Sequence, residues 1–518
     1  MQPPARPKIP AGPSRHVYDV IVLGSQLGGA LAGALLAKRG HRVLFVEHDG
    51  MGPGYEHGRY LLPYAPSLIP SLKTMPAVEE AFTELGLSTA VQRALKPHHP
   101  DLQLVLPRHR VDLHADEARR RAELAREFGD GAAALQEALT QASRQHEEGD
   151  AFFKAGPELP PDGMFETWAF RKQVRQHPAL EAPSRLGGDD AASALLRGLL
   201  PFVTHLDAPQ GPLALTRPLS QALRSPYRFP GGREGLRELL AKRITELGGD
   251  VLTREGGEAF IVEELSFEGG KFAGLKVLRS DTLYRGNCLV AATDAGALRR
   301  LIADKKRQSS LATHLDLSTT KRFLFTVNWV VPAELLPKGL GELTLVQPSG
   351  SEAQAADALG PLLLQQHPAR LLPGKEQAGK DVAPREDESQ RVICAGAFVP
   401  ASARDLGEDH LKELAERIDA QLSHLLPFVK EKRFLRSAPY LDAGGVRGSR
   451  LLPHPLYAFE AEAFLGVSGL GQRTPVKNLL LAGREVLPGL GLEGELLAGM
   501  RAARLVQETL KKKDPLKG

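Results

Sequence analysis

The segment from Tyr18 to Asp49 constrains the fold of this chain more than any other part of the sequence. It opens with DVIVLG, an apolar and β-branched run suited to a strand buried on both faces of a parallel sheet. ALAGALLAKRG follows with small and apolar residues at helical spacing and stops at Gly40, and HRVLFVE is a second strand that ends at Glu47. This order of strand, glycine turn, helix and strand predicts a Rossmann-like βαβ unit in an α/β protein.

The turn between the first strand and the helix is close to a dinucleotide-binding sequence. The usual pattern is Gly-x-Gly-x-x-Gly, and residues 24–29 read Gly-Ser-Gln-Leu-Gly-Gly. Gly24 permits the tight turn, and Gly29 lets the helix pack closely against the strand. The helix N-terminus then offers N–H groups to a diphosphate. Glu47 stands where a carboxylate accepts hydrogen bonds from ribose hydroxyls.

Gln26 occupies the position of the middle glycine, where a bare backbone normally lets phosphate oxygens approach. Its side chain can point away from the phosphate, fill the phosphate volume, or donate its amide to a phosphate oxygen. Ser25 and Gly28 complete the candidate contacts of the turn, and Gly28 gives the turn some slack. A Rossmann-like unit that holds no nucleotide is the alternative interpretation.

Two later blocks repeat the alternation of glycine turns with helices and strands. In the block from Tyr227 to Glu264, paired glycines precede an amphipathic helix, and DVLT is a following strand. A hairpin with its turn at Gly269-Gly270 comes next. In the block from Lys477 to Leu510, the buried strand NLLLAG leads through a glycine-rich turn into a helix.

In this order the three blocks resemble the flavin-dependent phytoene desaturase and carotenoid isomerase family, within the wider amine-oxidase-like superfamily. FPGGREGLRELLAKRITELGGDV is similar to the P-x-GG segment of that family. LLLAGREVLPGLGLEGELLAGMRAAR is similar to its carboxy-terminal FAD signature. The combination is far more specific than one glycine motif.

The resemblance implies FAD as the cofactor and assigns its contacts. Gly24, Gly29 and Glu47 match the positions at the pyrophosphate and the ribose, and the backbone at Val262 lies near the adenine position. The remaining contacts come from the third block and would approach the ribityl chain and the pyrimidine edge of the flavin: Gly483, Arg484, Gly491, Leu492, Glu493 and Gly494.

Arg484 departs from the family pattern, because that position is commonly acidic. A cation near a diphosphate is favourable, so Arg484 can help to hold the cofactor. A salt bridge to Glu485 or to a neighbouring domain is the other interpretation. The paired glycines expected after Glu47 are also altered, with Pro53 between Gly52 and Gly54.

At 518 residues the chain is too long for one ordinary core, so more than one domain is expected. The resemblance implies a discontinuous FAD-binding domain from residues 17–75, 226–302 and 474–512. An α+β substrate domain would comprise residues 76–225 and 303–473, with flexible tails at 1–16 and 513–518. Residues 365–390 are rich in charge, Pro and Gly, which predicts a long exposed excursion.

The function implied by the resemblance is that of an FAD-dependent oxidoreductase acting on a hydrophobic polyene or isoprenoid-like substrate. Desaturation or isomerisation would proceed by hydride transfer to flavin N5. The alternative is a flavin-fold protein that has lost FAD and binds a lipid or a protein. An amine oxidase is a third interpretation. Apolar substrates occur in membranes, so peripheral membrane contact is expected.

Composition argues against several other classes of protein. The formal net charge is +4 and the charges are mixed along the chain, so no nucleic-acid partner is expected. The only cysteines, Cys288 and Cys394, lie in apolar runs and are interpreted as buried strand thiols in a cytoplasmic protein.

Several conspicuous residues are assigned structural roles. The KPHHP stretch at 96–100 is interpreted as a surface turn, and the charged run 114–128 as an exposed helix. Trp168 and Trp329 are assigned to the core. The sequence indicates no metal site and no catalytic acid or base.

Overall fold

The computed structural model describes residues 17–511 except 49, 185–190, 225, 254–260, 279–281, 304–307, 351, 353–356, 374–383 and 449–451. The predicted tails at 1–16 and 513–518 lie outside these residues. Among the residues described, no helix is long and apolar enough to cross a membrane.

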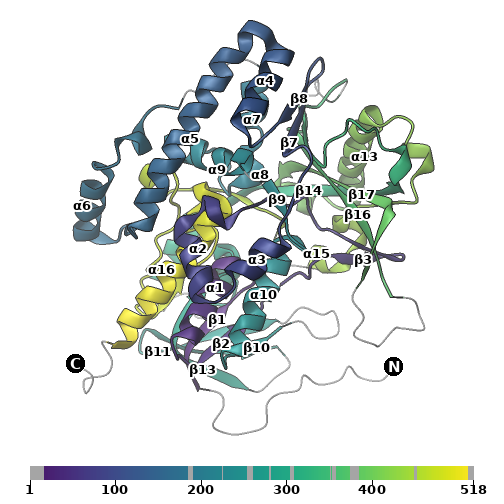
Figure 1. Ribbon diagram of the computed structural model, residues 1–518. Helices are drawn as coiled ribbons and strands as arrows, with labels where there is room; N and C mark the ends of the chain where they lie inside the picture. Colours follow the sequence, from purple (N-terminus) through teal and green to yellow (C-terminus); the bar gives the residue numbers. More distant parts are fainter. Residues whose placement is uncertain are drawn as a thin grey trace, which may run out of the picture.

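A mostly parallel sheet forms the lower part of the molecule (Figure 1). In spatial order its strands are β10 (Asp250–Leu252), β2 (Val43–Val46), β1 (Val17–Leu23), β13 (Leu283–Ala291), β12 (Lys271–Val277) and β11 (Val262–Glu268), with β20 (Leu479–Leu481) also paired to β13. Strands β10, β2, β1, β13 and β20 are parallel, and β11 and β12 form an antiparallel hairpin. The predicted βαβ unit, hairpin and α/β fold class are therefore confirmed.

Three helices from distant parts of the chain pack beside one another on this sheet: α10 (Gly232–Glu246), α1 (Leu27–Lys38) and α16 (Gly491–Lys511). The central helix, α1, is buried from Leu27 to Ala37, which explains its small and apolar sequence. Gly28 is required by the close approach of α16. A Cβ at Gly28 would lie 2.0 Å from the carbonyl oxygen of Ala482 and 2.4 Å from that of Glu495.

A larger, mainly antiparallel sheet lies on the right of Figure 1, with α13 (Glu408–Leu425) packed against it. Its main path is β18 (Leu435–Ser437), β14 (Ser318–Pro332), β17 (Arg385–Pro400), β16 (Leu362–Leu371), β15 (Leu343–Val346), β7 (Leu102–Val105) and β8 (Arg110–Leu113). The strands β19 (Leu456–Phe459), β4 (Tyr60–Leu62) and β3 (Tyr55–His57) extend it. A small sheet consists of β5 (Ile69–Pro70), β9 (Pro226–Arg228) and β6 (Lys96–Pro97).

The remaining helices gather mainly in the upper left of Figure 1 and around the two sheets. They are α2 (Pro76–Glu84), α3 (Ser88–Ala94), α4 (Glu117–Phe128), α5 (Ala132–Lys154), α6 (Gly163–Val174), α7 (Ala191–Arg197), α8 (Leu200–Val203), α9 (Pro212–Arg224), α11 (Ala295–Arg300), α12 (Ser309–Asp316), α14 (Pro439–Asp442) and α15 (Gly444–Gly448). Helix α4 confirms the exposed charged helix, with an ion pair between Glu117 and Arg121.

Two expectations about local segments are wrong in part. The stretch 96–100 is exposed at Lys96, Pro97 and His99, as expected of a surface turn, but β6 pairs with β9 and His98 is fully buried. Half of 365–390 is not an excursion, because residues 365–371 and 385–390 lie in the paired strands β16 and β17; the part at 374–383 lies outside the described residues. Pairing between distant strands orders parts of both segments despite their polar composition, although Lys96, Pro97 and Glu386 stay exposed.

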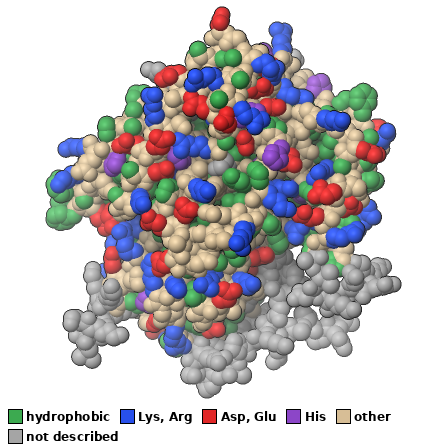
Figure 2. All heavy atoms as spheres, in the orientation of Figure 1, with side chains coloured by type: hydrophobic (Ala, Val, Ile, Leu, Met, Phe, Trp, Pro, Cys, Tyr) green, Lys and Arg blue, Asp and Glu red, His purple; other side chains and the backbone are tan. Residues whose placement is uncertain are grey.

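The two tryptophans have opposite environments. Trp329 is fully buried in the larger sheet, as expected, and its Nε1–H donates to Asp419 at 2.7 Å. The prediction for Trp168 is wrong, because this side chain on α6 is 67% exposed beside Met164 and Phe165. Figure 2 shows this apolar face at the left edge of the molecule. Cys288 and Cys394 are buried on strands β13 and β17, as expected.

Candidate functional site

A cavity of about 420 Å³ lies beside the glycine turn that precedes α1. Ser25, Gln26 and Leu27 form one part of its wall, and residues 61–68 and 228–234 form others. Its size is within the range typical of small-molecule sites. It adjoins the carboxyl end of β1, where ligands bind in open α/β sheets.

The glycine turn keeps the backbone that a dinucleotide fold requires. Gly24 has φ +120°, and a Cβ there would lie 2.0 Å from the carbonyl oxygen of Ala292, so only glycine fits. Gly29 packs against Ala292. A Cβ added at Gly29 would lie 2.3 Å from the Cβ of Ala292. The two outer glycines of the motif therefore serve the turn and the close packing that the sequence indicates.

Gln26 crosses from the turn to two neighbouring loops. Its Nε2 donates to Asp294 Oδ1 at 2.8 Å, and its Oε1 accepts from the Arg484 backbone N–H at 2.8 Å. A Cβ at Gly483 would lie 2.2 Å from Gln26 Oε1, so the glycine at 483 makes room for the glutamine. The side chain is 2% exposed and is fixed by the protein at both ends.

Glu495 of α16 occupies the N-terminus of α1. Its carboxylate accepts a hydrogen bond from the Leu27 backbone N–H and forms an ion pair with Arg233. The residue is 1% exposed. A helix N-terminus attracts anions through its free N–H groups and its dipole, so a carboxylate of the chain here stands where a diphosphate would bind.

Glu47 and Val262, the expected ribose and adenine contacts, also have partners within the chain. Arg237 Nη2 lies 2.5 Å from Glu47 Oε1 and donates to the carbonyl of Met51 at 2.6 Å. The Val262 backbone N–H donates to His48 Nδ1 at 3.0 Å. Three groups are expected to bind a dinucleotide: the N-terminus of α1, the Glu47 carboxylate and the Val262 N–H. Each of these three anchors has the expected chemistry, and each contacts a side chain of this protein.

Arg484 and Glu485 do not pair with each other in the way the sequence suggests. Arg484 Nε lies 3.7 Å from Asp294 Oδ1, which also accepts a hydrogen bond from Tyr457 at 2.5 Å. Glu485 accepts from the Ala295 N–H at 2.6 Å and from the Ser318 hydroxyl. Burial, and then the charge of Asp294, raise the pKa of Glu485 to about 8.

This raised pKa makes stability depend on pH. The native protein binds a proton at Glu485 that the unfolded chain has lost above its ordinary pKa of 4.5, so stability should fall as pH rises from about 4.5 to about 8. Glu485→Gln should flatten that part of the profile. Thermal unfolding at a series of pH values tests this, with the exposed Glu431→Gln as control. An unchanged slope in Glu485→Gln would contradict the assignment.

The first residues of α16, from Gly491 to Gly494, do not border the large cavity. A Cβ at Gly491 would lie 1.9 Å from the carbonyl oxygen of Val203, and Gly491 and Leu492 border only a void of about 20 Å³. Gly494 packs against Leu487, whose carbonyl oxygen would be 2.1 Å from an added Cβ.

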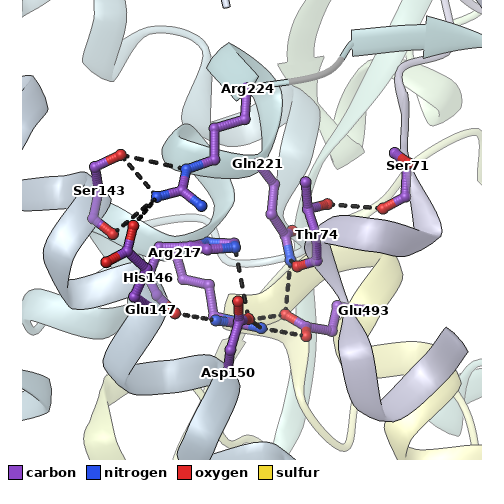
Figure 3. Close-up of polar contacts among 10 residues, drawn as sticks. All are labelled: Ser71, Thr74, Ser143, His146, Glu147, Asp150, Arg217, Gln221, Arg224 and Glu493. Atoms are coloured by element: carbon purple, nitrogen blue, oxygen red, sulfur yellow. Dashed lines mark hydrogen bonds and ion pairs between the residues drawn. The ribbon is translucent and has the colours of Figure 1, made fainter. Parts of the chain in front are cut away.

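Glu493 lies in a buried ionic cluster (Figure 3). Arg217 Nε and Nη2 contact its two carboxylate oxygens at 2.5 and 2.6 Å, and both side chains are 0% exposed. Gln221 donates to Glu493 at 2.8 Å. Arg217 also donates to the His146 carbonyl at 2.9 Å and to Asp150 at 2.8 Å. The cluster joins α9 and α5 to the first turn of α16.

The residues fit FAD at the adenosine and diphosphate positions by the chemistry of their groups. The α1 N-terminus, the Glu47 carboxylate and the Val262 N–H are the donors and acceptors required. Of these, the α1 N-terminus borders the cavity, together with the guanidinium groups of Arg233, Arg237 and Arg484. Glu495, Arg237 and His48 are side chains, so rotamer changes would free the anchors.

Arg233, Arg237 and His48 are residues that the sequence interpretation missed. Arg233 and Arg237 are four residues apart and follow the paired glycines at 231 and 232. If the segment is a helix, this spacing places both arginines on one face of it. That spacing could have indicated them. His48 has no comparable signal, because its partner Val262 is 214 residues away.

No protein-family model matches the sequence, and no curated protein is significantly similar to it. Solved structures do share its fold. An oxidoreductase from Methanosarcina mazei aligns with 94% of this chain and 99% of its own at 14% identity and a TM-score of 0.52. Putrescine oxidase bound to putrescine and cyclohexylamine oxidase from Brevibacterium oxydans each align over 95% and 99% of the two chains, at 14% identity and a TM-score of 0.53.

At this identity the likeness establishes the fold and nothing finer. It confirms the predicted amine-oxidase type of fold, with a Rossmann-like unit, over nearly the whole chain. The narrower resemblance to phytoene desaturases and carotenoid isomerases stays a prediction.

Proposed function

We propose that the protein is an FAD-dependent oxidoreductase that acts on a largely hydrophobic substrate. The observation that carries this proposal is the convergence of the α1 N-terminus and of Arg233, Arg237 and Arg484 on one cavity at the carboxyl end of the parallel sheet, with Glu47 paired to Arg237 behind its wall. The fold shared with putrescine oxidase and cyclohexylamine oxidase supports the same class of chemistry. FAD would supply a hydride acceptor.

The residues of the chain have separate tasks in this proposal. The Leu27 N–H and the guanidinium groups of Arg233 and Arg484 would bind the diphosphate. Glu47 would accept from the ribose hydroxyls, and the Val262 N–H would bind the adenine. The apolar part of the cavity wall would orient the substrate and exclude water.

Substrate chemistry separates this proposal from an amine oxidase. Six cationic side chains line the cavity against three acidic ones: Lys96, Arg228, Arg233, Arg237, Arg370 and Arg484 against Glu234, Glu386 and Glu495. A net positive lining disfavours a cationic amine. A polyene or isoprenoid-like substrate remains our proposal, and product analysis with such polyenes against simple amines distinguishes the two.

The second candidate function is that of a binding protein without FAD. It is favoured by one observation: Leu27 N–H, Glu47 and Val262 N–H are each engaged within the chain.

Peripheral membrane contact fits either function, because Met164, Phe165 and Trp168 form an exposed apolar face on α6. Co-sedimentation with vesicles, compared with a Trp168→Ser variant, tests that contact.

Visible absorption tests the proposed function directly. The purified protein, incubated with FAD and freed of unbound flavin, should retain an absorption band near ~450 nm. Because the anchors are engaged within the chain, we expect partial occupancy as isolated and a rise on reconstitution. A preparation that stays colourless, both as the wild type and as the Glu495→Ala variant, would exclude the flavoenzyme and leave the binding protein.

A further inference from the structure

We propose that the cavity binds an amphipathic anion, with a carboxylate or phosphate headgroup held by Arg228 and Arg370 and an apolar body directed towards the α1 turn. This inference deepens the proposed function by naming the class of substrate, and it rests on that function for the redox step.

Two pairs of strands bring the cationic side chains together. Lys96 and Arg228 are opposite one another on β6 and β9, and Arg370 and Glu386 are opposite one another on β16 and β17. An ion pair of 3.8 Å between Lys96 and Glu386 joins the two pairs of strands. Lys96 and Glu386 are half-exposed, with side chains 53% and 49% accessible, so this cluster forms the solvent edge of the cavity.

Arg228 and Arg370 are the cations of this edge without an acidic partner. Of the six cations that line the cavity, four have a carboxylate within 4.0 Å: Lys96, Arg233, Arg237 and Arg484. In the part of the chain that the structure describes, no carboxylate lies that close to Arg228 or Arg370. The Arg228 Nε is buried and has no hydrogen-bond partner among the described residues. A buried guanidinium donor without a partner is costly unless a ligand satisfies it.

The pKa of His367 shows that the charges of Arg228 and Arg370 both reach the same side chain. Burial, followed by the charges of Arg228 and Arg370, lowers the pKa of His367 to about 4. The imidazole is therefore neutral at physiological pH and does not supply the binding charge. Two guanidinium groups around one neutral ring suit a carboxylate or phosphate, which accepts paired N–H donors.

The rest of the cavity is suited to an apolar body. Several apolar and aromatic residues belong to its wall: Leu61, Tyr64, Pro66, Leu68, Phe202 and Phe229. Ser25 and Gln26 of the α1 turn border the same cavity. A ligand whose headgroup lies at the arginines would therefore have an apolar wall for its body in the cavity that the α1 turn also borders.

Binding of matched acids and alcohols tests this inference on the full-length protein. Calorimetry would compare oleate with oleyl alcohol, and farnesyl phosphate with farnesol, below their aggregation concentrations. At least one acid should bind about tenfold or more tightly than its alcohol, because hydrogen bonds to charged groups contribute that much. If oleate binds and farnesyl phosphate does not, the headgroup of the ligand is a carboxylate. If farnesyl phosphate binds and oleate does not, the headgroup is a phosphate.

Arg228→Gln and Arg370→Gln should each weaken the acid by about tenfold and leave the alcohol unchanged. Arg391→Gln is the matched control, because Arg391 lies on β17 of the same sheet and does not border the cavity. Thermal unfolding shows that each variant is folded, and either arginine alone suffices for the test. Equal affinity for acid and alcohol, no binding of either acid, or unchanged affinity in both variants would overturn the inference.

The two proposals fail in different ways. Charge-dependent binding in a protein that takes up no flavin would retain the anion site and remove the redox function. Flavin uptake without charge-dependent binding would retain the redox function and remove the anion site. Both readouts are independent of catalytic turnover.

Discussion

Arg217→Met is expected to lower the free energy of unfolding by about 3–5 kcal/mol. The substitution leaves the Glu493 carboxylate fully buried with Gln221 as its remaining side-chain partner. An uncompensated buried charge costs more than the ion pair itself contributes, because the carboxylate has lost its hydration and gained no cation. The same change removes the contacts of Arg217 with Asp150 and with the His146 carbonyl.

Chemical denaturation followed by circular dichroism measures this effect. Arg224→Met is the matched control, because Arg224 lies on the same helix and its ion pair with Glu147 is solvent-exposed, so a loss of about 1 kcal/mol or less is expected. The double variant Arg217→Met, Glu493→Leu should be more stable than Arg217→Met, since it removes the stranded charge. A double variant no more stable than the single one would show that packing, and not the charge, explains the loss.

Local elements of this fold could be predicted from the sequence because their signals are local. The βαβ unit, the hairpin at Gly269-Gly270 and the strand–turn–helix ending in α16 each appear as one periodic segment with glycine at its turns. Gly24 could be assigned to a tight turn because its role depends on the backbone alone.

Contacts between distant segments could not be predicted in the same way. Arg217 and Glu493 are 276 residues apart, and Leu27 and Glu495 are 468 apart. Nothing in a single sequence indicates that a carboxylate near the start of α16 caps α1 and not its own helix. For the same reason the burial of His98 was missed, because it depends on strand pairing and not on the KPHHP stretch itself.

Glu495→Ala is expected to tighten FAD binding by about tenfold or more. In the wild-type protein the Glu495 carboxylate accepts the Leu27 N–H and pairs with Arg233. A diphosphate would have to displace this carboxylate or bind beside it, and either arrangement costs free energy. Alanine frees the N–H at the helix N-terminus and releases Arg233 for the cofactor.

Fluorescence titration of FAD, together with the absorption of flavin retained after gel filtration, measures the change. Glu495→Gln should give an intermediate affinity, because it removes the charge and keeps a group that can fill the space. Glu508→Ala is the matched control on the same helix, since Glu508 is 51% exposed and does not border the cavity. If Glu495→Ala bound FAD no more tightly than the wild type, the carboxylate would not compete with a diphosphate, and the N-terminus of α1 would have to be abandoned as the cofactor site. A gain in affinity would instead mean that the chain carries its own substitute for the diphosphate, and that FAD binding proceeds by exchange of one anion for another.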